Sequence, residues 1–183
     1  MERSVEDQLV ASEFVGFWKR VLISIVDVLV LLLPAYLINK FFVWATEYYH
    51  SAIPLFIQFA LLGAFNIYMV VKYGGTPGKL LLKVRIINAD GQLPSVKQAL
   101  IRYSIYILNS LLAVIMSLSA YDNLSFFSNG GEWLPLVIGM NAFLGFVIII
   151  DCLCVAFLKN NRAVHDLMAG TYVVDKEAMD SLK

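Results

Sequence analysis

The sequence predicts an all-α membrane protein, in which a four-transmembrane-helix bundle carries a small cytoplasmic platform. Apolar residues make up 60% of the 183 residues and the mean hydropathy is +0.73, whereas a soluble domain is about 45–50% apolar. Charged residues make up only 15% of the chain, which leaves too little polar surface for a soluble globule. Four apolar segments are each long enough to cross a bilayer.

These segments organise the whole chain. The N-terminal segment is acidic and has no apolar core, so we expect no cleavable signal peptide and a retained first helix. A single membrane domain should cover 17–174, between a cytoplasmic segment at 1–16 and a tail at 175–183. Its predicted transmembrane helices span about 17–38, 54–71, 96–120 and 134–158, and its platform consists of 74–95 and 160–174.

The distribution of charge predicts the orientation. The two loops expected outside, 39–53 and 121–133, contain Lys40 as their one basic residue and three acids. The other 13 of the 14 lysines and arginines lie on the opposite side or at its border. The positive-inside rule therefore predicts that both termini are cytoplasmic.

The first part of the platform begins with two glycines that should break the second helix. Thr76 and Pro77 form a helix start, with Thr as the N-cap and Pro at the first helical position. The three leucines that follow would lie against lipid headgroups while Lys79 and Lys83 extend toward water.

Two runs in the platform have the composition of β-strands. Residues 84–87 are followed by a turn at 88–91, and 171–174 form the other such run. We expect these two runs to pair as a short two-stranded sheet beneath the membrane.

Two carboxylates interrupt apolar helices. Asp27 lies in the middle of the first helix and Asp151 near the inner end of the fourth. A charge near the centre of a spanning helix costs about 2.5–3.5 kcal/mol, so each residue needs a proton, a partner or a water-filled cavity. Each is either a functional site or a hydrogen-bonding site between helices.

One amide in each of the other two helices lies at a similar depth. From the rise per residue, Asp27 is about 15 Å and Asp151 about 12 Å from the inner helix ends, and Asn66 and Asn109 are about 9–10 Å from theirs. Four such residues would form one polar ring if all face the bundle interior. The alternative for the two amides is hydrogen bonding between helices.

The chemistry of this ring suits protons and hard cations. Carboxylate and amide oxygens are ligands for such ions, and desolvation favours the protonated form of a carboxyl group. Cys152 and Cys154 have no histidine or further cysteine near them in sequence, and we interpret them as buried apolar residues. We therefore expect no bound metal and no cofactor.

Three segments form a recognisable pattern. They are 16–20 (Gly-Phe-Trp-Lys-Arg) followed by Asp27; 74–79 (Gly-Gly-Thr-Pro-Gly-Lys) followed by 84–91; and 161–174, which contains His165-Asp166 and then Gly170-Thr171. In these segments the chain resembles membrane proteins of the RDD family, named for an arginine and two aspartates.

The resemblance implies that Arg20 is the family arginine, Asp27 the first aspartate and Asp166 the second. It also implies a bacterial inner-membrane protein, for which transport, including cation/proton exchange, is the usual suggestion. The sequence departs from the pattern at Lys83, where relatives commonly have glycine.

The roles of Arg20, His165 and Asp166 stay open at this stage. Arg20 is either a topology anchor or a partner of one of the three aspartates. Asp166 either caps a following turn or salt-bridges Arg20 or Arg162 as a structural residue, or pairs with Arg20 to close the cytoplasmic mouth over Asp27 and Asp151. No serine or cysteine is placed as a nucleophile beside His165 and Asp166, so we do not expect an enzyme.

Two functions follow from these residues. The first is a small transporter or cation/proton exchange component that handles a monovalent cation or a proton. Four helices are few for a transporter, so a homo-oligomer is expected, with close contacts at Gly139, Ala142 and Gly145. The second is a non-transporting accessory or assembly partner that docks through its platform. Beyond the lipid bilayer we expect no nucleic acid partner.

Overall fold

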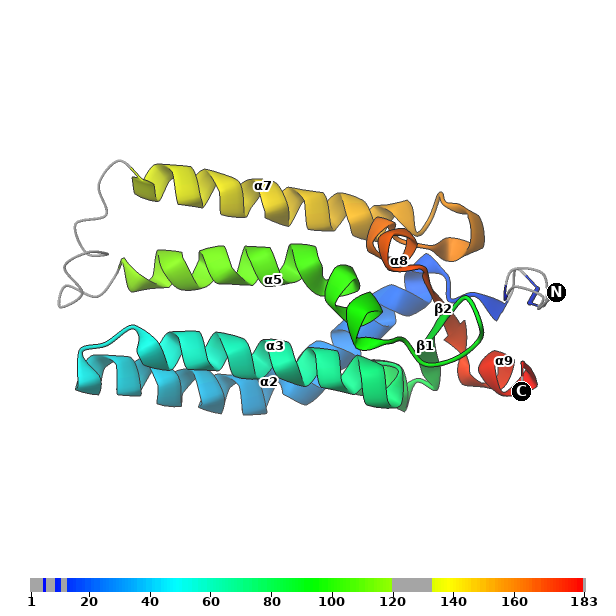
Figure 1. Cartoon of the computed structure of the whole chain (residues 1–183), viewed down its shortest axis with the longest axis horizontal. Coiled ribbons are helices and arrows are strands. Elements are labelled where there is room, and N and C mark those ends of the chain that lie inside the picture. The colour runs from blue at the N-terminus through cyan, green and yellow to red at the C-terminus, as the bar shows by residue number, and fades with distance from the viewer. Residues whose placement is uncertain (1–4, 6–8, 11–12, 120–132, 183) are drawn as a thin grey trace. The chain divides into compact units, whose positions relative to one another are not determined.

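The computed structural model describes residues 5, 9–10, 13–119 and 133–182 (Figure 1). The four long helices are α2 (Phe17–Tyr49), α3 (Ile53–Tyr73), α5 (Val96–Leu118) and α7 (Trp133–Cys154). The short elements are α4 (Pro77–Leu81), β1 (Val84–Asn88), η2 (Lys159–Asn161), α8 (Val164–Ala169), β2 (Thr171–Asp175) and α9 (Lys176–Ser181).

The predicted fold class is confirmed. Among the described residues, four helices are long and apolar enough to cross a membrane. Many of their apolar side chains are exposed in the single chain, for example Leu29 at 68% and Phe143 at 65%. Such surface is stable against lipid, and the chain is therefore a multi-pass membrane protein.

Two helix ends differ by four or more residues from the predicted positions. Helix α2 continues past Ile38 to Tyr49, because no glycine or proline interrupts 39–49, and most of the predicted loop 39–53 is helical. Helix α7 ends at Cys154, four residues before the predicted end, where the chain tightens into a turn that leads to η2. The predicted loop 121–133 lies almost wholly outside the described residues.

The chain divides into two compact units. The first contains 1–31, 65–103 and 149–183, and so holds the sheet, the short helices and one end of each long helix. The second contains 32–64 and 104–148, which are the remaining parts of the long helices.

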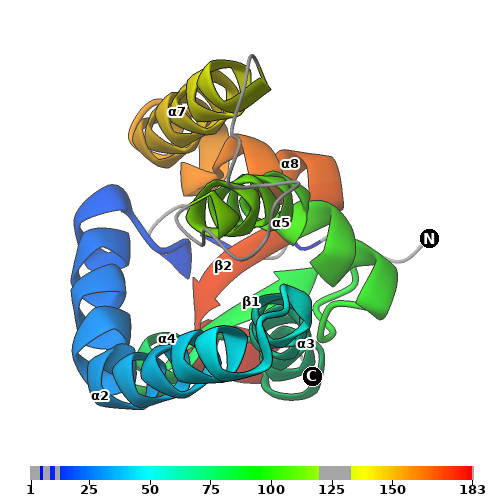
Figure 2. The same ribbon diagram turned by 90° about the vertical axis from the view of Figure 1, so that its left-hand side faces the viewer.

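The predicted strand pairing is confirmed in the first unit. Strands β1 and β2 are antiparallel and lie side by side, with Ile86 opposite Val173 and Ile87 opposite Tyr172 (Figure 2). The backbone of Phe14 bridges to Val174, so the segment before α2 lies along β2. The two ends of the chain are therefore joined in one unit.

Each face of the small sheet is covered by an apolar cluster, as the two-residue period of a strand requires. One cluster covers the face of Ile87 and Tyr172, and the other covers the face of Ile86 and Val173. The buried members are Val5, Leu9, Phe14, Ile87, Tyr172, Val174 and Ala178 in the first, and Val15, Ile23, Val70, Val84, Ile86, Ala99 and Val173 in the second. The second cluster fixes α2, α3 and α5 onto the sheet.

Candidate functional site

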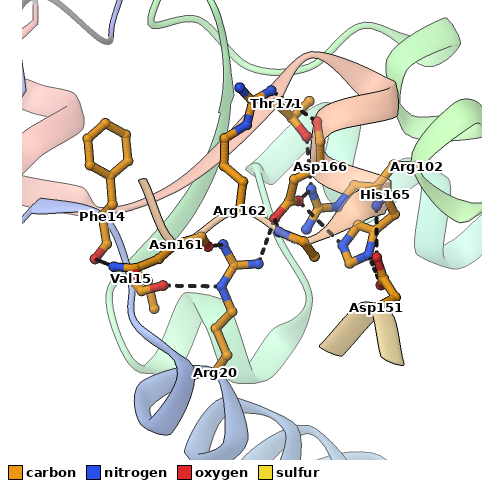
Figure 3. A network of polar contacts seen from close by, with 11 residues as sticks. Phe14, Val15, Arg20, Arg102, Asp151, Asn161, Arg162, His165, Asp166 and Thr171 are labelled. Atoms are coloured by element: carbon orange, nitrogen blue, oxygen red, sulfur yellow. Dashed lines mark hydrogen bonds and ion pairs between the residues drawn. The ribbon is translucent and has the colours of Figure 1, made fainter. Parts of the chain in front are cut away.

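A buried carboxylate shared by two arginines lies at the centre of the first unit (Figure 3). Asp166 on α8 is fully buried, and its Oδ2 accepts a hydrogen bond from Arg20 Nη1 at 2.7 Å. Its Oδ1 pairs closely with Arg102 of α5, whose Nη1 also donates to the Thr171 hydroxyl at 2.9 Å. One carboxylate thus ties the starts of α2 and α5 to α8.

Arg20 also donates hydrogen bonds to two backbone carbonyls. Its Nη2 donates to the carbonyl of Asn161 at 2.6 Å and its Nε to the carbonyl of Val15 at 3.2 Å. The Asn161 side chain in turn donates to the carbonyl of Phe14 at 3.2 Å. Of the partners considered from the sequence, Arg20 therefore pairs with Asp166, and it also holds the segment that enters α2.

Asp166 also orders its own helix. Its Oδ2 accepts a hydrogen bond at 3.1 Å from the backbone N–H of Ala163, the residue just before α8. Arg162, which the sequence offered as another partner of Asp166, stacks instead on the ring of Tyr172 with Cζ 4.2 Å from the centroid. Its Nη2 donates to the backbone carbonyl of Asp166 at 3.4 Å, and its Nη1 donates to the Tyr172 hydroxyl at 3.3 Å.

A second buried carboxylate holds the start of α8. Asp151, near the end of α7, accepts a hydrogen bond from the backbone N–H of His165 at 2.9 Å, and its other oxygen contacts His165 Nδ1 closely. Burial, together with the nearby charge of Arg102, lowers the pKa of His165 to about 4, although the contact with Asp151 opposes this shift. His165 is therefore neutral near pH 7, and the carboxylate assigns its proton to Nδ1.

Asp27 makes the corresponding contact with α4. Its Oδ1 accepts a hydrogen bond from the backbone N–H of Gly78 and its Oδ2 one from the Thr76 hydroxyl, both at 2.6 Å. A Cβ on Gly78 would lie 2.8 Å from Asp27 Cγ, from Asp27 N and from the Ile23 carbonyl oxygen. Only glycine allows α4 to approach α2 this closely.

The contacts of Asp27 revise one expectation for α4. The helix starts after Thr76 with Pro77 at its first position, as predicted, but the Thr76 hydroxyl donates to Asp27 instead of capping the helix. Lys79 does not simply extend toward water. It is half-buried, donates to Thr76 at 3.4 Å, and lies within range of the charges of Asp27 and Arg102.

Comparison with known proteins identifies the family. The family model described as "RDD family" matches residues 14–170, which include Arg20, Asp27 and Asp166. The chain belongs to the RDD family. No curated protein and no solved structure gives a significant match.

In this RDD-family chain the backbone at Lys83 has a conformation that usually favours glycine. Lys83 has φ +54°, in the left-handed region that glycine enters without strain. The backbone at this point leaves α4 and enters β1. A glycine at position 83 of this RDD-family chain would adopt this conformation without strain.

Three residues of the predicted polar ring, Asp27, Asp151 and Asn109, contact different partners. Asp27 and Asp151 accept hydrogen bonds from different short helices. Asn109 lies in the second unit, where Asn141 Nδ2 donates to its carbonyl at 2.9 Å and to its side-chain oxygen at 3.3 Å. Asn66 belongs to the first unit. One ring of all four residues in this RDD-family chain stays a prediction.

Several site residues were not singled out from the sequence. They are Thr171, Asn161, Asn141 and, above all, Arg102, which is 4% exposed and pairs with Asp166. The signal for Arg102 was available, because it is a charged residue six positions inside an apolar helix. Asn161 has φ +51°, a conformation that asparagine tolerates better than most residues.

Proposed function

We propose that this RDD-family chain acts in the bacterial inner membrane as a small transporter or cation/proton exchange component, with both termini in the cytoplasm. The orientation is supported by the positive-inside rule and by the pairing of Phe14 with Val174, which joins the two ends in one unit. Its role is non-enzymatic, and the species it carries is a monovalent cation or a proton.

One observation carries this proposal. Each aspartate within a spanning helix accepts a hydrogen bond from the N–H at the second position of a short helix, Asp27 from Gly78 and Asp151 from His165. A proton or cation that binds either carboxylate neutralises its charge and so weakens the charge-assisted hydrogen bond from that N–H. Ion binding is thereby linked to release of the short helix, and such a link is what an exchange cycle needs.

The Arg20–Asp166 pair has a closing role in this proposal. It joins the beginning of α2 to α8, beside the pair formed by Asp151 and His165. Opening would separate Arg20 from Asp166 and expose Asp151.

A homo-oligomer is part of the proposal. A Cβ added to Gly139 or to Gly145 would meet no atom within 4 Å in the single chain. This open surface on α7 suits close contact with a helix of a second copy.

The test is proton flux in proteoliposomes under an imposed sodium, potassium or lithium gradient. Asp27→Asn and Asp151→Asn should abolish cation-dependent flux while the protein still inserts. The matched control is Asp90→Asn, which removes an exposed carboxylate in the turn after β1 and should leave flux unchanged. Flux that persists in both aspartate variants would refute exchange through these carboxylates.

A second function is favoured by the same contacts. Every carboxylate oxygen of Asp27 and Asp166 accepts a hydrogen bond from the protein itself, as expected of a fixed scaffold. In that case the chain is an accessory or assembly partner that presents its platform (74–95 and 160–174) to another protein. A partner that co-purifies with the wild type but not with a charge-reversed platform would support it, whereas purification of the chain alone would count against it.

A further inference from the structure

Helix α8 has an apolar exposed face. Val164, Leu167 and Met168 follow one another at the spacing of a single helical face and are 38%, 45% and 54% exposed. The opposite side carries His165, Asp166 and Ala169, all buried. The polar residues therefore point inward and the apolar residues outward, the reverse of a helix at a water-exposed surface.

The contact with Asp151 fixes the depth of α8. Helix α7 has 22 residues and is about 33 Å long, only slightly more than the hydrocarbon thickness of about 30 Å. Asp151 lies three residues before its end, about 4–5 Å inside, so the expected depth of about 12 Å is wrong because α7 ends earlier than predicted. The backbone N–H of His165 lies 2.9 Å from the carboxylate of Asp151, so the first turn of α8 is level with the end of α7.

The end of α7 also carries exposed apolar residues. Ile149 and Leu153 are exposed on α7 at 58% and 47%, and Phe157, just after its end, is 87% exposed. The exposed apolar residues at this end of α7 would face lipid, because α7 is long and apolar enough to span a membrane. The same lipid would reach the face of α8 without any additional partner.

We propose that α8 is an interfacial helix, with Val164, Leu167, Met168 and the adjacent Phe157 inserted among the lipids at the inner boundary of the bilayer. The depth set by Asp151 and the exposed apolar residues at the end of α7 favour lipid over water or a second copy of the chain. Helix α8 then contacts lipid on one face and the Arg20–Asp166–Arg102 cluster on the other.

The test is collision accessibility of spin labels in protein reconstituted into phosphatidylcholine/phosphatidylglycerol vesicles. Cys152 and Cys154 are replaced by serine, and one label is placed at Met168→Cys or, in a second variant, at Leu167→Cys. The matched control is Glu177→Cys, an exposed position on α9 in the same unit. Unchanged elution from a size-exclusion column shows that each labelled variant is folded.

Labels at Met168 and Leu167 should collide more with oxygen, which concentrates in lipid, than with a water-soluble nickel chelate, and the label at Glu177 should show the opposite preference. Nickel accessibility equal to that at Glu177 would place α8 in water and overturn the proposal. Low collision rates with both reagents would mean that protein covers this face, for example a second copy, and would overturn it equally.

Discussion

The carboxylate of Asp27 caps α4 from another helix, since it accepts the backbone N–H of Gly78 at 2.6 Å. Asp151 does the same for α8 through the backbone N–H of His165 at 2.9 Å. Neither short helix has a side-chain cap of its own, because the Thr76 hydroxyl donates to Asp27 and Ala163 has no polar side chain. Two aspartates that look unpaired in the sequence thus hold the short helices against the long ones.

The close approach of α4 to α2 gives the first prediction. Gly78→Ala places a Cβ 2.8 Å from backbone atoms of Asp27 and Ile23, so α4 must move away and its cap is weakened. We expect a loss of about 1–3 kcal/mol in unfolding free energy, measured by denaturant titration in detergent micelles. Gly63→Ala is the matched control, since a Cβ there meets no atom within 4 Å, and an equal loss in both variants would contradict the contact.

The arginine pair around Asp166 gives the second prediction. Asp166→Asn leaves Arg20 and Arg102 in a buried site without their anion, and we expect a loss of about 3–5 kcal/mol. The control is Asp175→Asn, which breaks the half-exposed pair with Lys19 and should cost about 1 kcal/mol or less. Similar losses in the two variants would show that the buried pairs of Asp166 contribute no more to stability than the half-exposed pair of Asp175 with Lys19.

The left-handed backbone at Lys83 gives the third prediction. Lys83→Gly removes the strain of φ +54° at the cost of extra freedom in the unfolded chain, and we expect a net gain of about 1 kcal/mol in stability. Lys83→Ala removes the same charge but keeps the Cβ, so it should give no gain. The measurement is thermal unfolding of the wild type, Lys83→Gly and Lys83→Ala. An equal gain in stability in the alanine variant would show that the effect comes from removing the charge.

The buried histidine gives the fourth prediction. The pKa of His165 is about 4 in the folded protein and near 6.5 unfolded, so the unfolded chain binds more protons between these values. Stability should therefore fall as pH is lowered from about 6.5 to 4, by up to about 1.4 kcal/mol per pH unit from this group. Unfolding free energies at a series of pH values should show a shallower slope for His165→Gln than for His50→Gln, which changes the exposed histidine.

The asparagine pair in the second unit gives the fifth prediction. Asn141→Leu removes the donor to Asn109, and a hydrogen bond between transmembrane helices contributes on average about 0.6 kcal/mol. We expect a loss of that order for Asn141→Leu and no further loss when Asn109→Leu is added. Additive losses in a double-mutant cycle would show that the two side chains do not interact.

Much of this fold could be predicted because its signals are local. A run of about 20 apolar residues specifies a spanning helix wherever it lies, and the strand-like runs at 84–87 and 171–174 were recognisable from composition alone. The family motif marked Arg20, Asp27 and Asp166, and the structure pairs two of them directly. The predicted end of α2 at Ile38 is too early, because the polar residues Lys40 and Glu47 are typical of a loop but do not by themselves stop a helix.

The sequence by itself determined four spanning helices, a short sheet and three aspartates that require partners. Only the tertiary structure decided which partners they have. Asp27 and Gly78 are 51 positions apart, and Arg102 and Asp166 are 64 apart, so no spacing rule along the chain links them. An aspartate needs hydrogen-bond donors or positive charges close to it in space. That proximity exists only after the helix ends have packed on the sheet in one unit.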